Sequence, residues 1–138
     1  MAFFIMLTHS ILRWIILLLY IGLLFYLSLI PGSSFDKFSY FSGIINFDKV
    51  VHAMMHFGLW SLIVWALKGP GKLVRNRWAI FTFSLFAVFT IGVIIELLQG
   101  YVGRSDLDWA DVSANVLGAL VAWGCWLALE NKLFIYKW

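Results

Sequence analysis

The chain has 138 residues, of which 63% are apolar and only 12% are charged. Soluble domains are about 45–50% apolar and about 25% charged, so too few polar side chains are present to cover a soluble fold. The formal net charge of +3 is modest, and the basic residues form no stripe with aromatic platforms, which argues against nucleic acid as a partner. Membrane lipids are the expected surroundings.

Apolar residues form four long stretches in chain order, at 14–30, 50–67, 78–98 and 109–129. A helix that spans a bilayer needs about 20 mostly apolar residues. Gly and Pro separate the stretches, at Pro31-Gly32, at Gly69-Pro70-Gly71, and at Gly100 and Gly103. We therefore predict an all-α polytopic membrane protein, a bundle of four transmembrane helices at about 12–30, 49–67, 77–99 and 106–130, in a single domain over 1–138.

Basic residues predict how these helices are oriented. The expected second loop carries Lys68, Lys72, Arg75 and Arg77, and short loops rich in Lys and Arg stay in the cytoplasm. With both termini on the same side, seven basic residues lie inside and three lie outside. We predict a multi-pass protein with both termini cytoplasmic, and we expect its inner face to carry only positive charges.

Polar side chains gather at the opposite, outer end of the predicted bundle. They open the second helix, close the third and continue into the fourth, as Asp48, Lys49, His52, Glu96, Gln99, Arg104, Asp106, Asp108, Asp111 and Asn115. Helical spacing places Asp48, His52 and His56 on one stripe, with similar stripes on the third and fourth helices. Polar stripes turn away from lipid, so these should converge on one pocket.

The order and spacing of these residues resemble the VanZ-like family over nearly the whole chain. The matching motifs are Pro31-Gly32, Asp48-Lys49-x-x-His52, Glu96-x-x-Gln99, and Arg104 followed by Asp111, Asn115 and Gly118. The resemblance implies a bacterial cytoplasmic (inner) membrane protein of the cell envelope, in a family named for a protein linked to teicoplanin resistance. His56 departs from the family, which commonly has an aromatic residue there.

Two functions fit the sequence. The first is an outward-facing site that binds a cell-envelope lipid head group, glycan or glycopeptide, lined by Asp48, Lys49, His52, Glu96, Gln99, Arg104, Asp111 and Asn115. The alternative is an accessory subunit of a larger membrane complex. No nucleophile with an obvious base is visible, so no catalytic residue or reaction is assigned. Metal ligands are available, but neither an H-E-x-x-H motif nor a Cys cluster is present, so no metal and no cofactor is predicted.

Several of these residues also have structural interpretations. Asp48 and Asp108 could cap helices, His52 could simply bond across helices and His56 could simply pack. Glu96 is expected to contact Arg104, with Gln99 adding a hydrogen bond, and that ion pair alone could tie the third helix to the loop. A ridge of small residues, Ala110, Ala114, Gly118 and Ala122, predicts close helix packing.

Overall fold

Every element that the structure describes is a helix. The computed structural model describes residues 2–30, 47–68, 76–103 and 107–135, with side chains at 10–30, 47–68, 76–103 and 107–130. The helices are α1 (Ala2–Leu29), α2 (Phe47–Leu67), α3 (Arg77–Tyr101) and α4 (Trp109–Ile135). All four are long and apolar enough to cross a membrane, which confirms the predicted all-α bundle of transmembrane helices.

The helix ends differ from the prediction at the two ends of the chain. Helix α1 begins at Ala2, about ten residues before the predicted start, and α4 continues to Ile135. Residues 2–11 contain neither Gly nor Pro, so nothing in their backbone chemistry stops the helix. Inside the chain, Asn76 accepts a hydrogen bond from the backbone N–H of Trp78 at 2.9 Å and so caps the start of α3.

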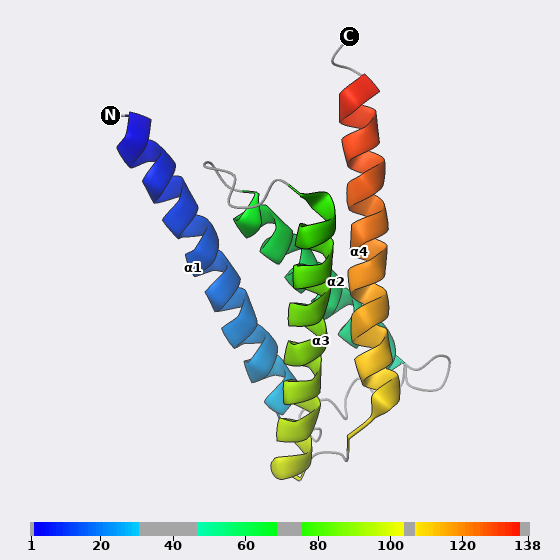
Figure 1. Ribbon diagram of the computed structural model, residues 1–138. Helices are drawn as coiled ribbons and strands as arrows, with labels where there is room; N and C mark the ends of the chain where they lie inside the picture. Colours follow the sequence, from blue (N-terminus) through cyan, green and yellow to red (C-terminus); the bar gives the residue numbers. More distant parts are fainter. Residues whose placement is uncertain (1, 31–46, 69–75, 104–106, 136–138) are drawn as a thin grey trace.

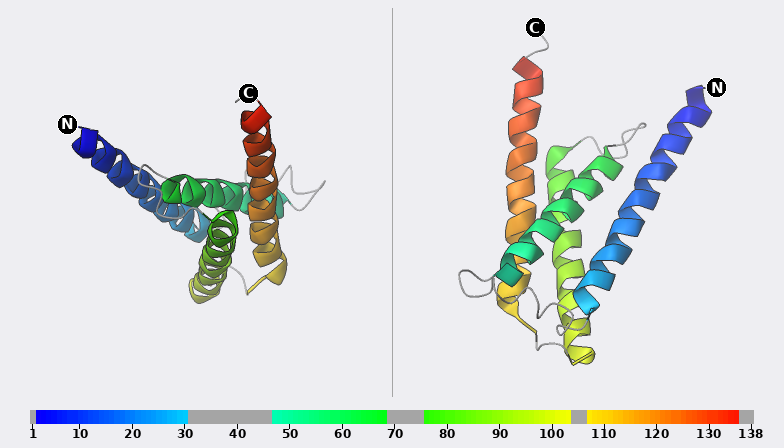
Figure 2. Two further views of the ribbon diagram at one scale, coloured as in Figure 1. Left: turned by 45° about the horizontal axis from the view of Figure 1, so that its top comes forward. Right: turned by 180° about the vertical axis from the view of Figure 1, so that it is seen from behind.

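Helix α2 lies between α1 and α4 and crosses the bundle obliquely (Figures 1 and 2). It packs most extensively against α4, while α1 packs against α2 and α3 and leans away from α4. Successive helices run in opposite directions, so the start of α1 and the end of α4 lie at the same end of the molecule (Figure 1). We call this the basic end, and we call the opposite end, where α2 and α4 begin, the polar end.

The surface and the core of the bundle are both apolar. Large side chains such as Leu19, at 68% exposed, and Phe86, at 70%, face outward, as expected for helices that contact lipid. Inside, Leu59, Ile80 and Ile95 are fully buried. Because the exterior and the interior are similarly apolar, the hydrophobic effect does not drive the helices together within lipid. Close packing and polar contacts therefore set their arrangement.

The closest backbone approach is between α2 and α4. A Cβ atom added at Gly118 would collide with the backbone carbonyl of Ala53, so the crossing requires glycine. Ala114 and Ala122 flank this point and are buried, which confirms the predicted packing ridge except at Ala110, whose side chain is exposed.

The expectation that one face carries only positive charges is wrong. Glu130, near the basic end, forms an ion pair with Lys68 between α4 and the end of α2. The Lys68 ammonium also lies 3.8 Å from the ring centre of Trp126. The acid was missed because it directly follows an apolar stretch, where one charge has little effect on hydropathy.

Candidate polar site

Seven polar side chains from three helices meet at the polar end, and we call them the polar cluster: Asp48, Lys49 and His52 of α2, Glu96 of α3, and Asp108, Asp111 and Asn115 at the start of α4. The antiparallel arrangement brings two helix starts and one helix end to the same depth. These seven side chains therefore lie close together, whereas the pocket that the sequence places here stays a prediction. The polar cluster also contains Asp108, which the predicted ligand-binding set leaves out.

Lys49 joins α2 to the start of α4. Its ammonium nitrogen lies 2.7 Å from Asp111 Oδ1 and 3.0 Å from Asp108 Oδ2. Asp108 Oδ1 accepts the backbone N–H of Ala110 at 2.8 Å, the bond of a helix N-cap, so Asp108 itself caps the start of α4. Lys49 and the Ala110 N–H together hold the pKa of Asp108 below its ordinary value, because both favour the ionised carboxylate.

His52 and Asn115 form a contact in the buried part of the cluster. His52 Nδ1 lies 3.1 Å from Asn115 Oδ1, and Asn115 is 0% exposed. A Cβ atom at Gly92 would lie 2.7 Å from Asn115 Nδ2, so the glycine leaves the space that the amide occupies. His56, one turn deeper, is buried and bonded through Nδ1 to the carbonyl of His52 at 3.1 Å, which supports the packing interpretation of His56.

Glu96 is the most deeply buried acid of the cluster, with 0% of its surface exposed. Its Oε2 accepts the backbone N–H of Asp108 at 3.3 Å, and its Oε1 lies 3.9 Å from His52 Nδ1. Within the described part of the chain, Oε1 has no hydrogen-bond partner. The expected Glu96–Arg104 contact involves a residue outside the described ranges, and that contact stays a prediction.

Gln99 takes a different direction from the other predicted site residues. It is 3% exposed, and its amide nitrogen donates to the backbone carbonyl of Ser28 at 2.9 Å. This bond connects α3 to the end of α1, an element that the prediction left out of the site. The only sequence signal for Ser28 is its place near the polar end of an apolar helix.

The polar cluster has a buried floor and an exposed rim. The side chains of Asp48 and Asp108 are 63% and 46% exposed, whereas His52, Glu96, Asp111 and Asn115 are buried. The described members contact one another, and with His52 neutral their four acids against one base give a formal charge of −3. Such a field favours cations, amines and hydroxyl-rich groups over a bare phosphate. No family model matches this chain, and no curated protein or solved structure matches it either.

Proposed function

We propose that this protein is a small multi-pass protein of the bacterial cytoplasmic membrane whose polar cluster binds a polar group of the cell envelope. The ligand is a lipid head group, a glycan or a glycopeptide, presented at the outer surface. The observation that carries the proposal is the gathering of seven polar side chains from three helices at one depth.

An energetic comparison supports a binding role for the polar cluster. Each ionisable group held in hydrocarbon costs up to about 2.5–3.5 kcal/mol on insertion scales, and less near the interface. One ion pair, such as Lys49 with Asp111, is enough to tie α2 to α4. The further buried groups exceed that need, and a binding site accounts for the surplus. The motif order shared with the VanZ-like family favours the same region of the chain.

The exposed rim defines the ligand chemistry of the proposal. Asp48 and Asp108 present carboxylates to the membrane surface, and Lys49 joins Asp108 of the rim to Asp111 of the buried floor. Two carboxylates can accept hydrogen bonds from the hydroxyl and amine groups of sugars, amino sugars or glycopeptides. A phosphate head group would have to approach through Lys49 and is less favoured by the net negative charge.

Ion pairs within the polar cluster favour one alternative function, that of an accessory subunit in a larger membrane complex. Lys49 is already bonded to two acids of its own chain, and much of the apolar surface of α1 is exposed. In that case the polar cluster is structural, and the outer surface of α1 contacts another subunit instead of lipid.

Conservative substitutions in the buried floor test the proposed function. We expect expression of the wild-type chain to change the teicoplanin susceptibility of a bacterial host. We expect Glu96→Gln, Asp111→Asn and Arg104→Gln each to abolish that change. The changes at Glu96 and Asp111 keep the side-chain volume and remove the ionisable group, and a lost hydrogen bond to a charged group is worth about 1.5–3 kcal/mol. The measurement is the inhibitory concentration, with protein level and detergent stability followed in parallel.

Glu130→Gln is the matched control, because it makes the same chemical change at the basic end. It should leave susceptibility at the wild-type value. Should the cluster variants keep that value too, but lose stability or dissociate from a larger complex, the accessory-subunit alternative would replace the binding proposal.

The orientation that this function requires is a separate prediction. In a Cys125→Ala background, which removes the exposed native thiol, a membrane-impermeant maleimide should label Asp36→Cys and miss Lys72→Cys in intact cells. The seven-to-three bias of basic residues is the reason. Both sites should label after permeabilisation. The reverse pattern in intact cells would place the polar end in the cytoplasm and would remove the outer-surface ligand from consideration.

A further inference from the structure

The hydrogen bonding of His52 leaves two acceptor atoms facing each other. Asn115 Oδ1, which can only accept, lies 3.1 Å from His52 Nδ1. In the neutral tautomer that satisfies this oxygen, Nδ1 carries the hydrogen and Nε2 carries a lone pair. Asp48 Oδ1 lies 3.8 Å from that Nε2. Two acceptors at this separation attract each other only when a cation or a proton lies between them.

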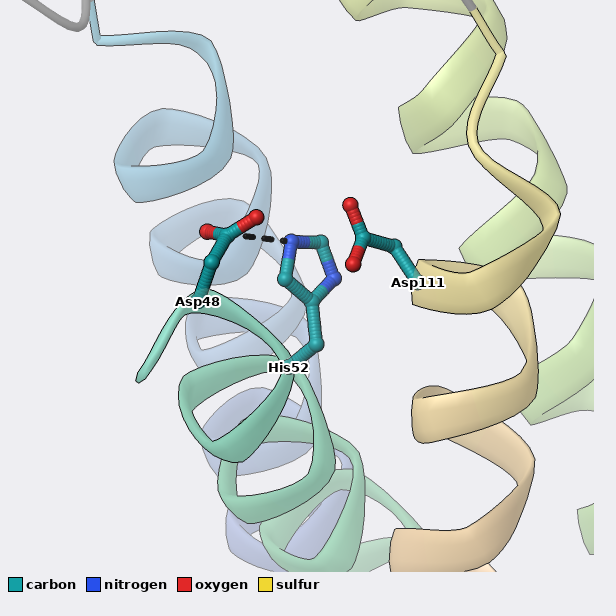
Figure 3. A group of neighbouring side chains, drawn as sticks. All are labelled: Asp48, His52 and Asp111. Atoms are coloured by element: carbon teal, nitrogen blue, oxygen red, sulfur yellow. Dashed lines mark ion pairs between the residues drawn. The ribbon is translucent and has the colours of Figure 1, made fainter. Parts of the chain in front are cut away.

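A second carboxylate completes the group around the imidazole. Figure 3 shows the His52 ring between the carboxyl groups of Asp48 and Asp111. One ligand atom from each of the three residues lies within 4.8 Å of the others. In a tetrahedral zinc site the ligand atoms are about 3.3–3.4 Å apart, which follows from metal–ligand distances of about 2.0–2.1 Å. A small closure suffices, and Asp48, whose side chain is 63% exposed, is free to make it.

Glu96 provides an independent observation, a buried carboxyl oxygen without a partner beside the imidazole ring. Its carboxyl group is 0% exposed and its Oε1, which has no hydrogen-bond partner among the described residues, is directed at the His52 ring. Burial there favours the protonated carboxyl group unless a cation lies close enough to stabilise the ionised form. The formal charge of −3 over the described polar cluster, counted with every acid ionised, also favours a bound cation.

We propose that Asp48, His52 and Asp111 bind a divalent transition-metal ion of the Zn²⁺ class. One imidazole with two carboxylates suits Zn²⁺ better than Mg²⁺ or Ca²⁺, which prefer oxygen ligands alone. Asn115 acts as a positioning residue, because an acceptor on the second ring nitrogen fixes the tautomer and orientation of a ligating histidine. Glu96 supplies negative charge beside the ligating ring.

Lys49 is the counterion that the metal would replace. Its ammonium lies 2.7 Å from Asp111 Oδ1 and is also bonded to Asp108, so it can release Asp111 and keep Asp108 as its partner. Metal binding therefore competes with an ion pair of the metal-free protein. Removing the ammonium should strengthen metal binding, whereas removing a ligand should weaken it.

This inference rests on the polar cluster of the proposed function but needs no envelope ligand, since it is measured with the metal alone. We expect the purified, chelator-treated full chain in detergent to bind one Zn²⁺ by titration calorimetry, and to give with Co²⁺ the visible absorption of a site with nitrogen and oxygen ligands. Mg²⁺ should not compete. Asp48→Asn should weaken Zn²⁺ binding by at least about tenfold, the lower limit seen even for residues that only orient ligands.

Glu130→Gln is the matched control, because it removes a carboxylate charge at the basic end, away from the ligand group and from Lys49. It should bind Zn²⁺ within a few-fold of wild type, and Lys49→Met should bind it more tightly. Absence of saturable Zn²⁺ binding, or equal weakening by Asp48→Asn and Glu130→Gln, would overturn the proposal. If the chain binds Zn²⁺ but the cluster variants leave teicoplanin susceptibility unchanged, the proposed function fails and the metal site stands.

Discussion

Gly118→Ala is expected to lower the thermal stability of the bundle by about 1–3 kcal/mol, the usual cost of inserting a methyl group into a closely packed core. The new Cβ would meet the backbone carbonyl of Ala53, and a carbonyl of helix α2 cannot rotate away as a side chain can. Helices α2 and α4 must therefore separate, and this is the most extensive helix contact of the bundle.

Gly124→Ala provides the control on the same helix, since nothing lies within 4 Å of the position where its Cβ would stand. Alanine is favoured over glycine in a helix interior by about 0.8–1.0 kcal/mol, so this variant should be as stable as wild type or more so. The measurement is the unfolding midpoint in one detergent, followed by tryptophan fluorescence. Equal midpoints for the two variants would mean that α2 and α4 do not approach closely at Gly118.

Lys49→Met should destabilise the metal-free protein by about 2–3 kcal/mol. The substitution leaves Asp111, whose side chain is 8% exposed, without its ammonium partner. Breaking a fully buried pair costs about 3–5 kcal/mol, and we expect less here because the Lys49 side chain is 29% exposed and water screens part of the interaction. The midpoint should be measured with chelator present, since a bound cation would replace the lost charge.

Two further variants make this result specific. The double variant Lys49→Met with Asp111→Asn should be more stable than Lys49→Met alone, because the uncompensated charge has been removed. Lys68→Met, at the basic end, should cost less than about 1 kcal/mol, as is typical of an exposed ion pair; its partnership with Glu130 involves side chains that are 35% and 30% exposed. A similar loss from both lysine variants, or no recovery in the double variant, would contradict a buried role for Asp111.

Hydropathy and helical spacing in the sequence determined the number of helices and the face on which each polar residue lies. Both properties are local. A run of about 20 apolar residues is long enough to cross a bilayer as a helix, and side chains at i and i+4 share a face wherever the helix is placed. The burial of Glu96, Asp111 and Asn115 was predictable for this reason. The early start of α1 was not, because residues 2–11 carry no signal that marks a boundary.

Tertiary structure alone decided which polar groups become partners. Lys49 bonds to Asp108 and Asp111, and Gln99 bonds to the backbone of Ser28, and helical spacing predicted neither set of partners. Partner choice depends on the distance and rotation between helices, which the close approach of Gly118 to Ala53 sets for α2 and α4. A periodic pattern in the sequence describes one helix at a time. It therefore contains neither the distance nor the rotation between two helices.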